Sequence, residues 1–156
     1  MSAPPERLVQ DWMANHLTEM GFDPVDLEVY IASCGRADIV ASCAPGLTTA
    51  IEVKRDCRSQ TLAQALGQAL TYKTSPSVGA ALVVVPNSDY RMLGGVLRAY
   101  EANGVWLIAV DMTPGAFMPL LPWAWPGNAG RYPWGTAGEM AAVGVDVYAH
   151  RKALVA

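Results

Sequence analysis

Two short strands and the turn between them decide the fold, and they lie in residues 35–54, which read GRADIVASCAPGLTTAIEVK. The runs 35–42 and 48–54 are rich in small apolar and β-branched residues, which favours strands. Pro45 and Gly46 between them are typical of a tight turn. We therefore predict an antiparallel hairpin in which residues whose numbers add to 90 lie opposite one another.

This register separates the hairpin into a charged face and an apolar face. Successive strand residues point to opposite faces, and residues that lie opposite one another share a face. Asp38 then lies opposite Glu52, and Arg36 lies opposite Lys54. The apolar face holds Ala37, Ile39, Ile51 and Val53. A shift of one residue would mix the two faces, so the pattern itself supports the register.

The two acidic residues of the charged face need a neutralising partner, because carboxylates opposite each other in a hairpin have Cβ atoms only ~5 Å apart and repel. Two carboxylates with a backbone carbonyl suit a hard divalent cation such as Mg²⁺, which keeps several waters. Lys54, two residues after Glu52, would then orient or polarise an attacking water, and Arg36 would hold a phosphate oxygen. Alternatively, the four charged residues form two surface ion pairs on a solvated strand face.

The elements predicted around the hairpin give the order αβββαβαβ. Periodic apolar residues predict helices, and β-branched or continuous apolar runs predict strands. The predicted helices are 6–20, 59–74 and 88–104, and the predicted strands are 25–33, 35–42, 48–54, 79–85 and 105–110. This order indicates an α/β fold with a central mixed sheet flanked by helices, and its second half predicts a buried parallel pair of strands.

The chain has 156 residues, which fits one domain. We expect residues 1–110 to form its core. Residues 111–156 change character: 111–138 are rich in Pro, Gly and Trp, and the end of the chain is compatible with a strand around 143–148 or a short helix. We expect this extension to pack on the same domain, with 111–138 serving either packing or contact with a second copy or a protein partner.

Composition excludes several classes of protein. Hydrophobic residues make up 52% of the chain, which excludes general disorder, and the apolar runs are too short to cross a membrane. The N-terminus lacks the apolar stretch of a signal peptide, so we expect a cytoplasmic protein without membrane contact. Three cysteines without CxxC spacing argue against a disulfide framework and a structural zinc site.

The net charge of −3 argues against a nucleic-acid partner only as an average over the chain. The basic residues are segregated, because the first 35 positions contain a single arginine while five of the 11 cations fall between residues 36 and 73. These five are Arg36, Lys54, Arg55, Arg58 and Lys73. A cation at the two carboxylates would leave this group as a locally positive rim.

Two motifs resemble the PD-(D/E)XK nuclease superfamily. Asp38 is followed after thirteen residues by Glu52-Val53-Lys54, which resembles the acidic and lysine signature. Gln68 and Tyr72 on the next predicted helix resemble the QxxxY motif of the RecB-like branch. The resemblance covers about residues 6–110 and implies a restriction-endonuclease-like fold, whose element order is the one predicted above.

The resemblance also implies roles for particular residues. Asp38 and Glu52 would bind the metal ion, the Val53 carbonyl would complete the site, and Lys54 would assist the attacking water. Ala37 stands where the superfamily name has proline, a position that does not bind metal. Gln68 and Tyr72 would lie at the edge of the site; the alternative is that Gln64 and Gln68 are solvent-facing helix formers and Tyr72 caps the core.

Members of the superfamily often add an acid from the first helix. Glu6 is the better candidate and Glu19 the alternative, while a glutamate in the first turn of a helix also simply favours the helix dipole.

The function expected from this reasoning is Mg²⁺- or Mn²⁺-dependent hydrolysis of DNA phosphodiester bonds. Arg36, Arg55, Arg58 and Lys73 would attract the DNA backbone. The alternative is a non-catalytic nucleic-acid-binding or protein-interaction protein that keeps the nuclease fold.

Overall fold

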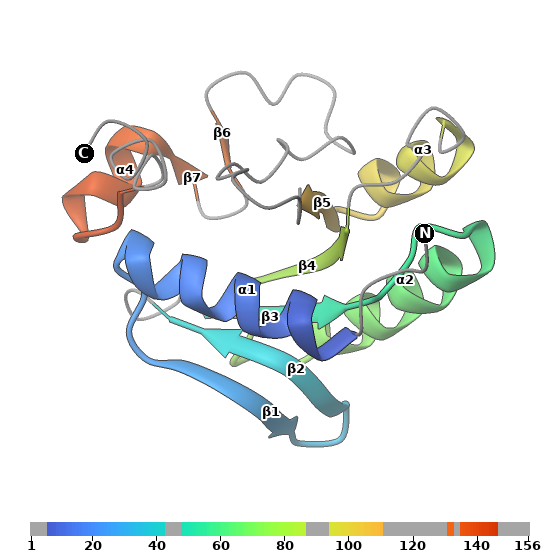
Figure 1. Cartoon of the computed structure of the whole chain (residues 1–156), viewed down its shortest axis with the longest axis horizontal. Helices are drawn as coiled ribbons and strands as arrows, with labels where there is room; N and C mark the ends of the chain where they lie inside the picture. The colour runs from blue at the N-terminus through green and yellow to red at the C-terminus, as the bar shows by residue number, and fades with distance from the viewer. Residues whose placement is uncertain (1–5, 43–47, 87–93, 111–130, 133–134, 147–156) are drawn as a thin grey trace.

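The computed structural model describes residues 6–42, 48–86, 94–110, 131–132 and 135–146 (Figure 1). Its elements follow the order predicted for the first 110 residues. The helices are α1 (Glu6–Met20), α2 (Ser59–Lys73), α3 (Gly94–Ala102) and α4 (Ala137–Ala142). The strands are β1 (Val25–Ile31), β2 (Gly35–Ala41), β3 (Thr49–Val53), β4 (Ala80–Pro86), β5 (Trp106–Val110), β6 (Arg131–Tyr132) and β7 (Gly135–Thr136).

The main sheet has five strands in the order β1-β2-β3-β4-β5. The pairs β1–β2 and β2–β3 are antiparallel, whereas β3–β4 and β4–β5 are parallel. The parallel pairs need crossovers, and α2 and α3 supply them. Figure 1 shows the strands stacked from β1 at the bottom to β5 at the top, with α1 running across the sheet. The predictions of an α/β fold, a mixed sheet and a parallel pair are confirmed.

Helices cover both faces of the sheet because alternate strand residues point in opposite directions. Leu82 and Val84 of β4 pack in one cluster with Val9, Met13 and Leu17 of α1. Val83 and Val85 pack in a second cluster with Leu62, Ala65 and Ala69 of α2 and with Tyr100 of α3. The continuous apolar run in β4 therefore serves two cores, which is typical of a parallel strand buried on both sides.

The described end of the chain joins the α1 side of the sheet. Met140 of α4 and Val145 lie in the same buried cluster as α1, and the backbone N–H of Asp146 donates to the carbonyl of Met20 at 2.7 Å. Of the two alternatives for the chain end, a short helix forms over Ala137–Ala142, within the residues that are described.

Two further sequence-based predictions concern residues that the structure does not describe. The predicted helix start at Ser88 and most of the candidate interface segment 111–138 lie outside the described residues. Within the described part of the chain, none of the helices has the length and apolar character that a membrane crossing requires.

Candidate functional site

The site forms where β2 and β3 stop pairing. The predicted register is confirmed for Ile39↔Ile51, Val40↔Ala50 and Ala41↔Thr49. The last ladder pair is Ile39 with Ile51, so the backbone pairing stops just short of Asp38. At that point the Asp38 side chain replaces a backbone acceptor, because its Oδ2 accepts the backbone N–H of Val53 at 2.7 Å. Beyond this bond β2 and β3 form no further ladder pair.

The backbone of Val53 is directed toward β2. The N–H and C=O of one residue in a strand point to the same side. The Val53 N–H points to Asp38, so its carbonyl faces the space between β2 and β3. The next N–H along the chain, that of Lys54, points the other way and donates to Val84 in β4 at 3.0 Å.

Glu52 is the buried acid of the site, with only 3% of the residue exposed. Burial, with the neighbouring Asp38 carboxyl next in effect, raises the pKa of Glu52 to about 8. In the absence of a cation the Glu52 carboxyl therefore binds a proton at neutral pH.

Tyr72 fixes this carboxyl from the α2 side. Its hydroxyl lies 3.1 Å from Glu52 Oε2 and 2.9 Å from the backbone oxygen of Arg36, and it can donate to either. Burial, with the Glu52 carboxyl next in effect, raises the pKa of Tyr72, which keeps the hydroxyl protonated as a donor. Tyr72 is thus a core residue and a contact of the site at once, which joins the two interpretations offered for it.

Loss of this hydroxyl gives the first testable prediction. Tyr72→Phe leaves the Arg36 carbonyl and the Glu52 carboxyl without their donor, so we expect a stability loss of about 1–2 kcal/mol in urea unfolding. The hydrogen bond from Tyr72 lowers the pKa of Glu52, so its removal is expected to raise that pKa further. Tyr30→Phe is the matched control, because Tyr30 is 71% exposed. Equal stability of the two variants would contradict the assigned contact.

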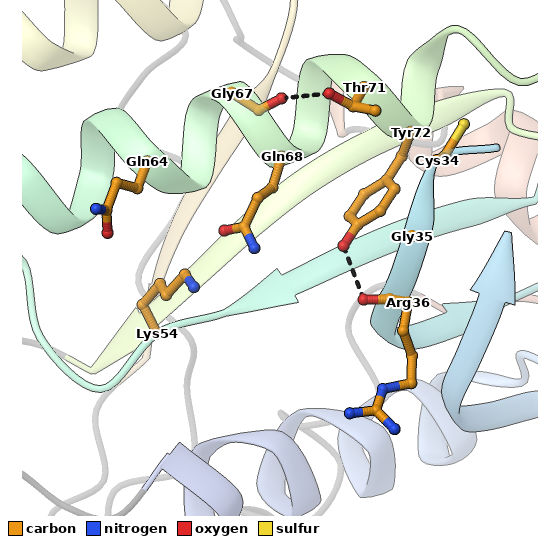
Figure 2. Close-up of a pocket in the computed structure, with 9 residues that line it drawn as sticks. All are labelled: Cys34, Gly35, Arg36, Lys54, Gln64, Gly67, Gln68, Thr71 and Tyr72. Atoms are coloured by element: carbon orange, nitrogen blue, oxygen red, sulfur yellow. Dashed lines mark hydrogen bonds between the residues drawn. The ribbon is translucent and has the colours of Figure 1, made fainter.

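A pocket of about 560 Å³ adjoins the carboxyl pair. Figure 2 shows Lys54, at the end of β3, and Gln68 and Tyr72, on α2, directed into the same space. Its lining residues are Cys34, Gly35, Arg36, Lys54, Gln64, Gly67, Gln68, Thr71 and Tyr72. They include the ammonium of Lys54 and no carboxylate, so the pocket favours an anionic or polar ligand.

Helix α1 brings Glu6 toward the carboxyl pair. Partial desolvation and then the Asp38 carboxylate raise the pKa of Glu6, while Lys54 and Arg55 act in the opposite direction. Glu6 is therefore within electrostatic range of three residues of the site. Glu19 is exposed near the other end of the helix, about 20 Å along its axis at 1.5 Å per residue. Of the two acids considered for the first helix, Glu6 is the one at the end of the helix whose charge interacts with Asp38, Lys54 and Arg55.

Gln10 is a contact that the sequence reasoning missed. Only 3% of this residue is exposed, and its side-chain amide donates to the backbone oxygen of Asp38 at 3.2 Å and to Glu28 Oε1 at 3.3 Å. It lies one helical turn after Glu6 and follows the buried Val9. A polar residue within the apolar side of a helix was the available signal.

Arg36 turns away from the face on which it was expected. Its guanidinium Nε pairs with Glu28 Oε2 at 3.4 Å, and Figure 2 shows its side chain directed away from Tyr72. The cause is local, because Glu28 has φ +55° and the β1–β2 register skips the pair Glu28 and Asp38. Beyond this point Ala37 packs with Ile31 and Tyr72, whereas Ile39 packs on the α1 side. The end of the hairpin is thus twisted relative to its base.

The remaining predicted cations have different settings. Arg55 and Arg58 are exposed between β3 and α2, beside Lys54. Lys73 lies elsewhere, because its ammonium donates to the carbonyls of Asn103 and Gly104 at 3.3 and 3.0 Å. Lys54 thus lies beside the carboxyl pair, Arg55 and Arg58 follow it in the exposed segment before α2, and Lys73 is separate, with its described contacts at the end of α3.

The donor set limits the kind of metal site. Within the described ranges, no three or more His, Cys, Asp and Glu side chains are arranged to hold a metal ion. Asp38, Glu52 and the Val53 carbonyl offer three oxygens, a set that suits a hard cation with retained waters. The buried Glu52 beside Asp38 also fits, because a divalent cation would neutralise both carboxylates.

Comparisons with known proteins provide no further evidence on function. No protein-family model matches the chain, and neither a curated protein nor a solved structure matches it.

Proposed function

We propose that this chain is a metal-dependent nuclease of the restriction-endonuclease-like fold that hydrolyses DNA phosphodiester bonds. The observation that carries the proposal is that the acids Asp38 and Glu52 lie next to each other, with Glu52 buried against the Tyr72 hydroxyl and Lys54 directly after the end of β3. A buried Glu52 beside a second carboxylate disfavours a purely structural role, because the repulsion between the two acids lowers stability unless a proton or a cation offsets it.

The element order supports the finer fold assignment. The succession α1-β1-β2-β3-α2-β4-α3-β5 agrees with the αβββαβαβ core that the PD-(D/E)XK resemblance implies. The acids lie on the central strands, and the Gln68 and Tyr72 motif lies on the helix that follows them. Tyr72 contacts Glu52 directly, which is a reason to treat the two motifs as one site.

The oxygen donors would hold Mg²⁺ or Mn²⁺ at the space between β2 and β3. Such an ion supplies charge stabilisation at the scissile phosphate and favours ionisation of the attacking water. Asp38 and Glu52 provide the carboxylates, and the Val53 carbonyl faces the same space. Tyr72 holds Glu52 in place by its hydrogen bond, and Gln10 holds Asp38 through the backbone.

Lys54 and the neighbouring arginines act on the substrate side. The Lys54 ammonium lies in the pocket, where it would orient the attacking water and offset the charge that develops on the phosphate. The exposed Arg55 and Arg58 would attract the DNA backbone, and Arg36 would do so from the hairpin side. The ion pair of Arg36 with Glu28 is exposed, so it is weak enough to be exchanged for a phosphate contact.

A cleavage assay tests the proposed activity. Linear, circular, single-stranded and branched DNA and an RNA are incubated with Mg²⁺, Mn²⁺ or EDTA. We expect DNA cleavage with either ion, none with EDTA, and none with Asp38→Asn. Binding of DNA without cleavage, unchanged in Asp38→Asn, would favour the non-catalytic alternative and contradict the proposal.

Cation binding should depend on pH, which gives the second prediction. Since the pKa of Glu52 is raised to about 8, a cation must displace the proton of the Glu52 carboxyl at lower pH. We expect Mn²⁺ affinity to fall about tenfold for each pH unit below that value, with about one proton released per ion. Calorimetry in two buffers of different ionisation enthalpy measures both quantities. A Mn²⁺ affinity that is constant between pH 6 and pH 8 would contradict the raised pKa of Glu52.

A further inference from the structure

One face of α2 lines the pocket beside the carboxyl pair and is accessible to solvent. Gln64, Gly67, Gln68 and Thr71 are spaced three and four residues apart on α2, so they lie on one face of the helix and line the pocket together (Figure 2). The side-chain amides of Gln64 and Gln68 supply both hydrogen-bond donors and acceptors. This face is solvent-accessible at Gln64, Gly67 and Gln68, so a ligand can reach it.

Gly67 has no structural requirement of its own. It lies inside a 15-residue helix, where glycine is less favourable than alanine. A Cβ atom at this position would meet no atom within 4 Å, and its backbone is not in the left-handed region. Neither packing nor a turn therefore explains the missing side chain. What the glycine provides is room at the wall of the pocket.

Charge and size together indicate the class of ligand. The Lys54 ammonium is directed into the pocket and no acid lines it, which favours a ligand with a negative group. The glutamine amides offer paired hydrogen bonds to a planar polar group such as a base edge. The volume of about 560 Å³ lies within the range of pockets that bind small organic ligands.

We propose that this pocket binds the base and sugar of one nucleotide whose phosphate lies at Lys54, with Gly67 making room for the base. The proposal rests on the proposed nuclease function and names its substrate class. A base held between α2 and the β1–β2 hairpin cannot remain paired and stacked in a duplex. The preferred substrate is therefore single-stranded DNA or an unpaired end.

Nucleotide binding without metal tests the pocket separately from cleavage. The full chain in EDTA is titrated with deoxyadenosine 5′-monophosphate, deoxyadenosine and inorganic phosphate, and binding is followed by calorimetry. We expect the nucleotide to bind at least tenfold more tightly than either part. Gly67→Leu should weaken nucleotide binding at least tenfold and leave phosphate binding unchanged. Gly95→Ala is the matched control, because Gly95 is an exposed helical glycine of α3 outside the pocket.

Thermal unfolding excludes damage to the fold. Leucine and alanine are better helix formers than glycine, so Gly67→Leu and Gly67→Ala should unfold at a temperature equal to or a few degrees above that of the wild type. Weaker nucleotide binding by a variant that is at least as stable as wild type supports a role for Gly67 in the ligand site.

Cleavage of matched substrates gives the second readout. With Mn²⁺ we expect a single-stranded oligonucleotide to be cleaved at least tenfold faster than the interior of a duplex, with Gly67→Leu losing most of this preference. Nucleotide binding without cleavage of any DNA would contradict the nuclease and support the pocket. Cleavage that depends on Glu52 but is unaffected by Gly67→Leu, or equal binding of nucleotide and phosphate, would overturn the pocket.

Discussion

Glu52→Gln is expected to abolish Mg²⁺-dependent cleavage and to stabilise the cation-free protein at neutral and alkaline pH. The amide cannot supply the negative charge that a hard cation requires, so we expect a loss of at least ~10³-fold in rate. It can nevertheless keep the local contacts, because its oxygen accepts from the Tyr72 hydroxyl and its N–H group donates to Asp38.

The expected gain in stability follows from the proton that Glu52 binds. The pKa of Glu52 is about 8 in the folded protein, against an ordinary value of 4.5. Between these values the folded state binds more protons than the unfolded state, so wild-type stability falls as pH rises. At ~1.4 kcal/mol per unit, the fall amounts to a few kcal/mol by pH 8. Glutamine does not titrate, so Glu52→Gln should lose this part of the pH dependence.

Urea unfolding at several pH values, with EDTA present, measures this difference. We expect the variant and the wild type to be similar near pH 5 and to diverge progressively toward pH 8. Glu19→Gln is the matched control, because Glu19 is an exposed acid of α1. Retained cleavage by Glu52→Gln, or a stability difference that does not grow with pH, would show that Glu52 has been assigned the wrong environment.

Lys54→Met is expected to remove cleavage while leaving cation binding intact. The side chain keeps its length and apolar stem but loses the ammonium that faces the pocket. A group that orients the attacking water and offsets charge in the transition state contributes ~10²–10⁴-fold in rate. We expect kcat to fall by this amount, with a small change in Mn²⁺ affinity measured by calorimetry.

Lys73→Met separates this effect from a general loss of positive charge. Lys73 is a lysine of the same predicted basic group, but its ammonium binds the carbonyls at the end of α3. We expect Lys73→Met to lower stability slightly and to leave kcat within about twofold of wild type, since its contacts are exposed hydrogen bonds. Equal losses of activity in the two variants would mean that only net charge matters, and that Lys54 has no catalytic role.

The elements and the hairpin register were predictable because their signals are local. Apolar periodicity defined α1 and α2 to within one residue at each end, and the two-face pattern gave the pairing of Ile39 with Ile51. A register error would have placed polar residues in the core, so the alternation carried strong information. The location of Glu52 and Lys54 toward α2 follows from the same alternation.

The end of the hairpin was less predictable because its structure depends on contacts between distant segments. The ladder was expected to continue to Arg36 and Lys54, but it stops at Ile39, where a side-chain carboxylate replaces a backbone acceptor. No local pattern predicts the positive φ of Glu28, a residue type that rarely adopts it. The predicted direction of the Arg36 side chain was therefore wrong, because Arg36 pairs with this Glu28.

The setting of Lys73 shows a similar limit. Its position in the sequence, on the helix of the QxxxY motif, suggested a contact with nucleic acid. Neighbouring residues on a helix point in different directions, so Lys73 faces α3 while Tyr72 faces Glu52. Which of the two directions leads to the site is determined by the packing of α2 against the sheet.

The most direct test of the central claim is a crystal structure of the protein grown with Mn²⁺ near pH 8, with the ion located by its anomalous scattering. We expect one strong peak between the Asp38 and Glu52 carboxylates, at ~2.0–2.3 Å from their oxygens and within reach of the Val53 carbonyl. The same experiment on Asp38→Asn should show no peak there. Absence of the ion from the wild-type pair, with Asp38 and Glu52 still hydrogen-bonded to each other, would contradict the claim that these two acids form a metal site.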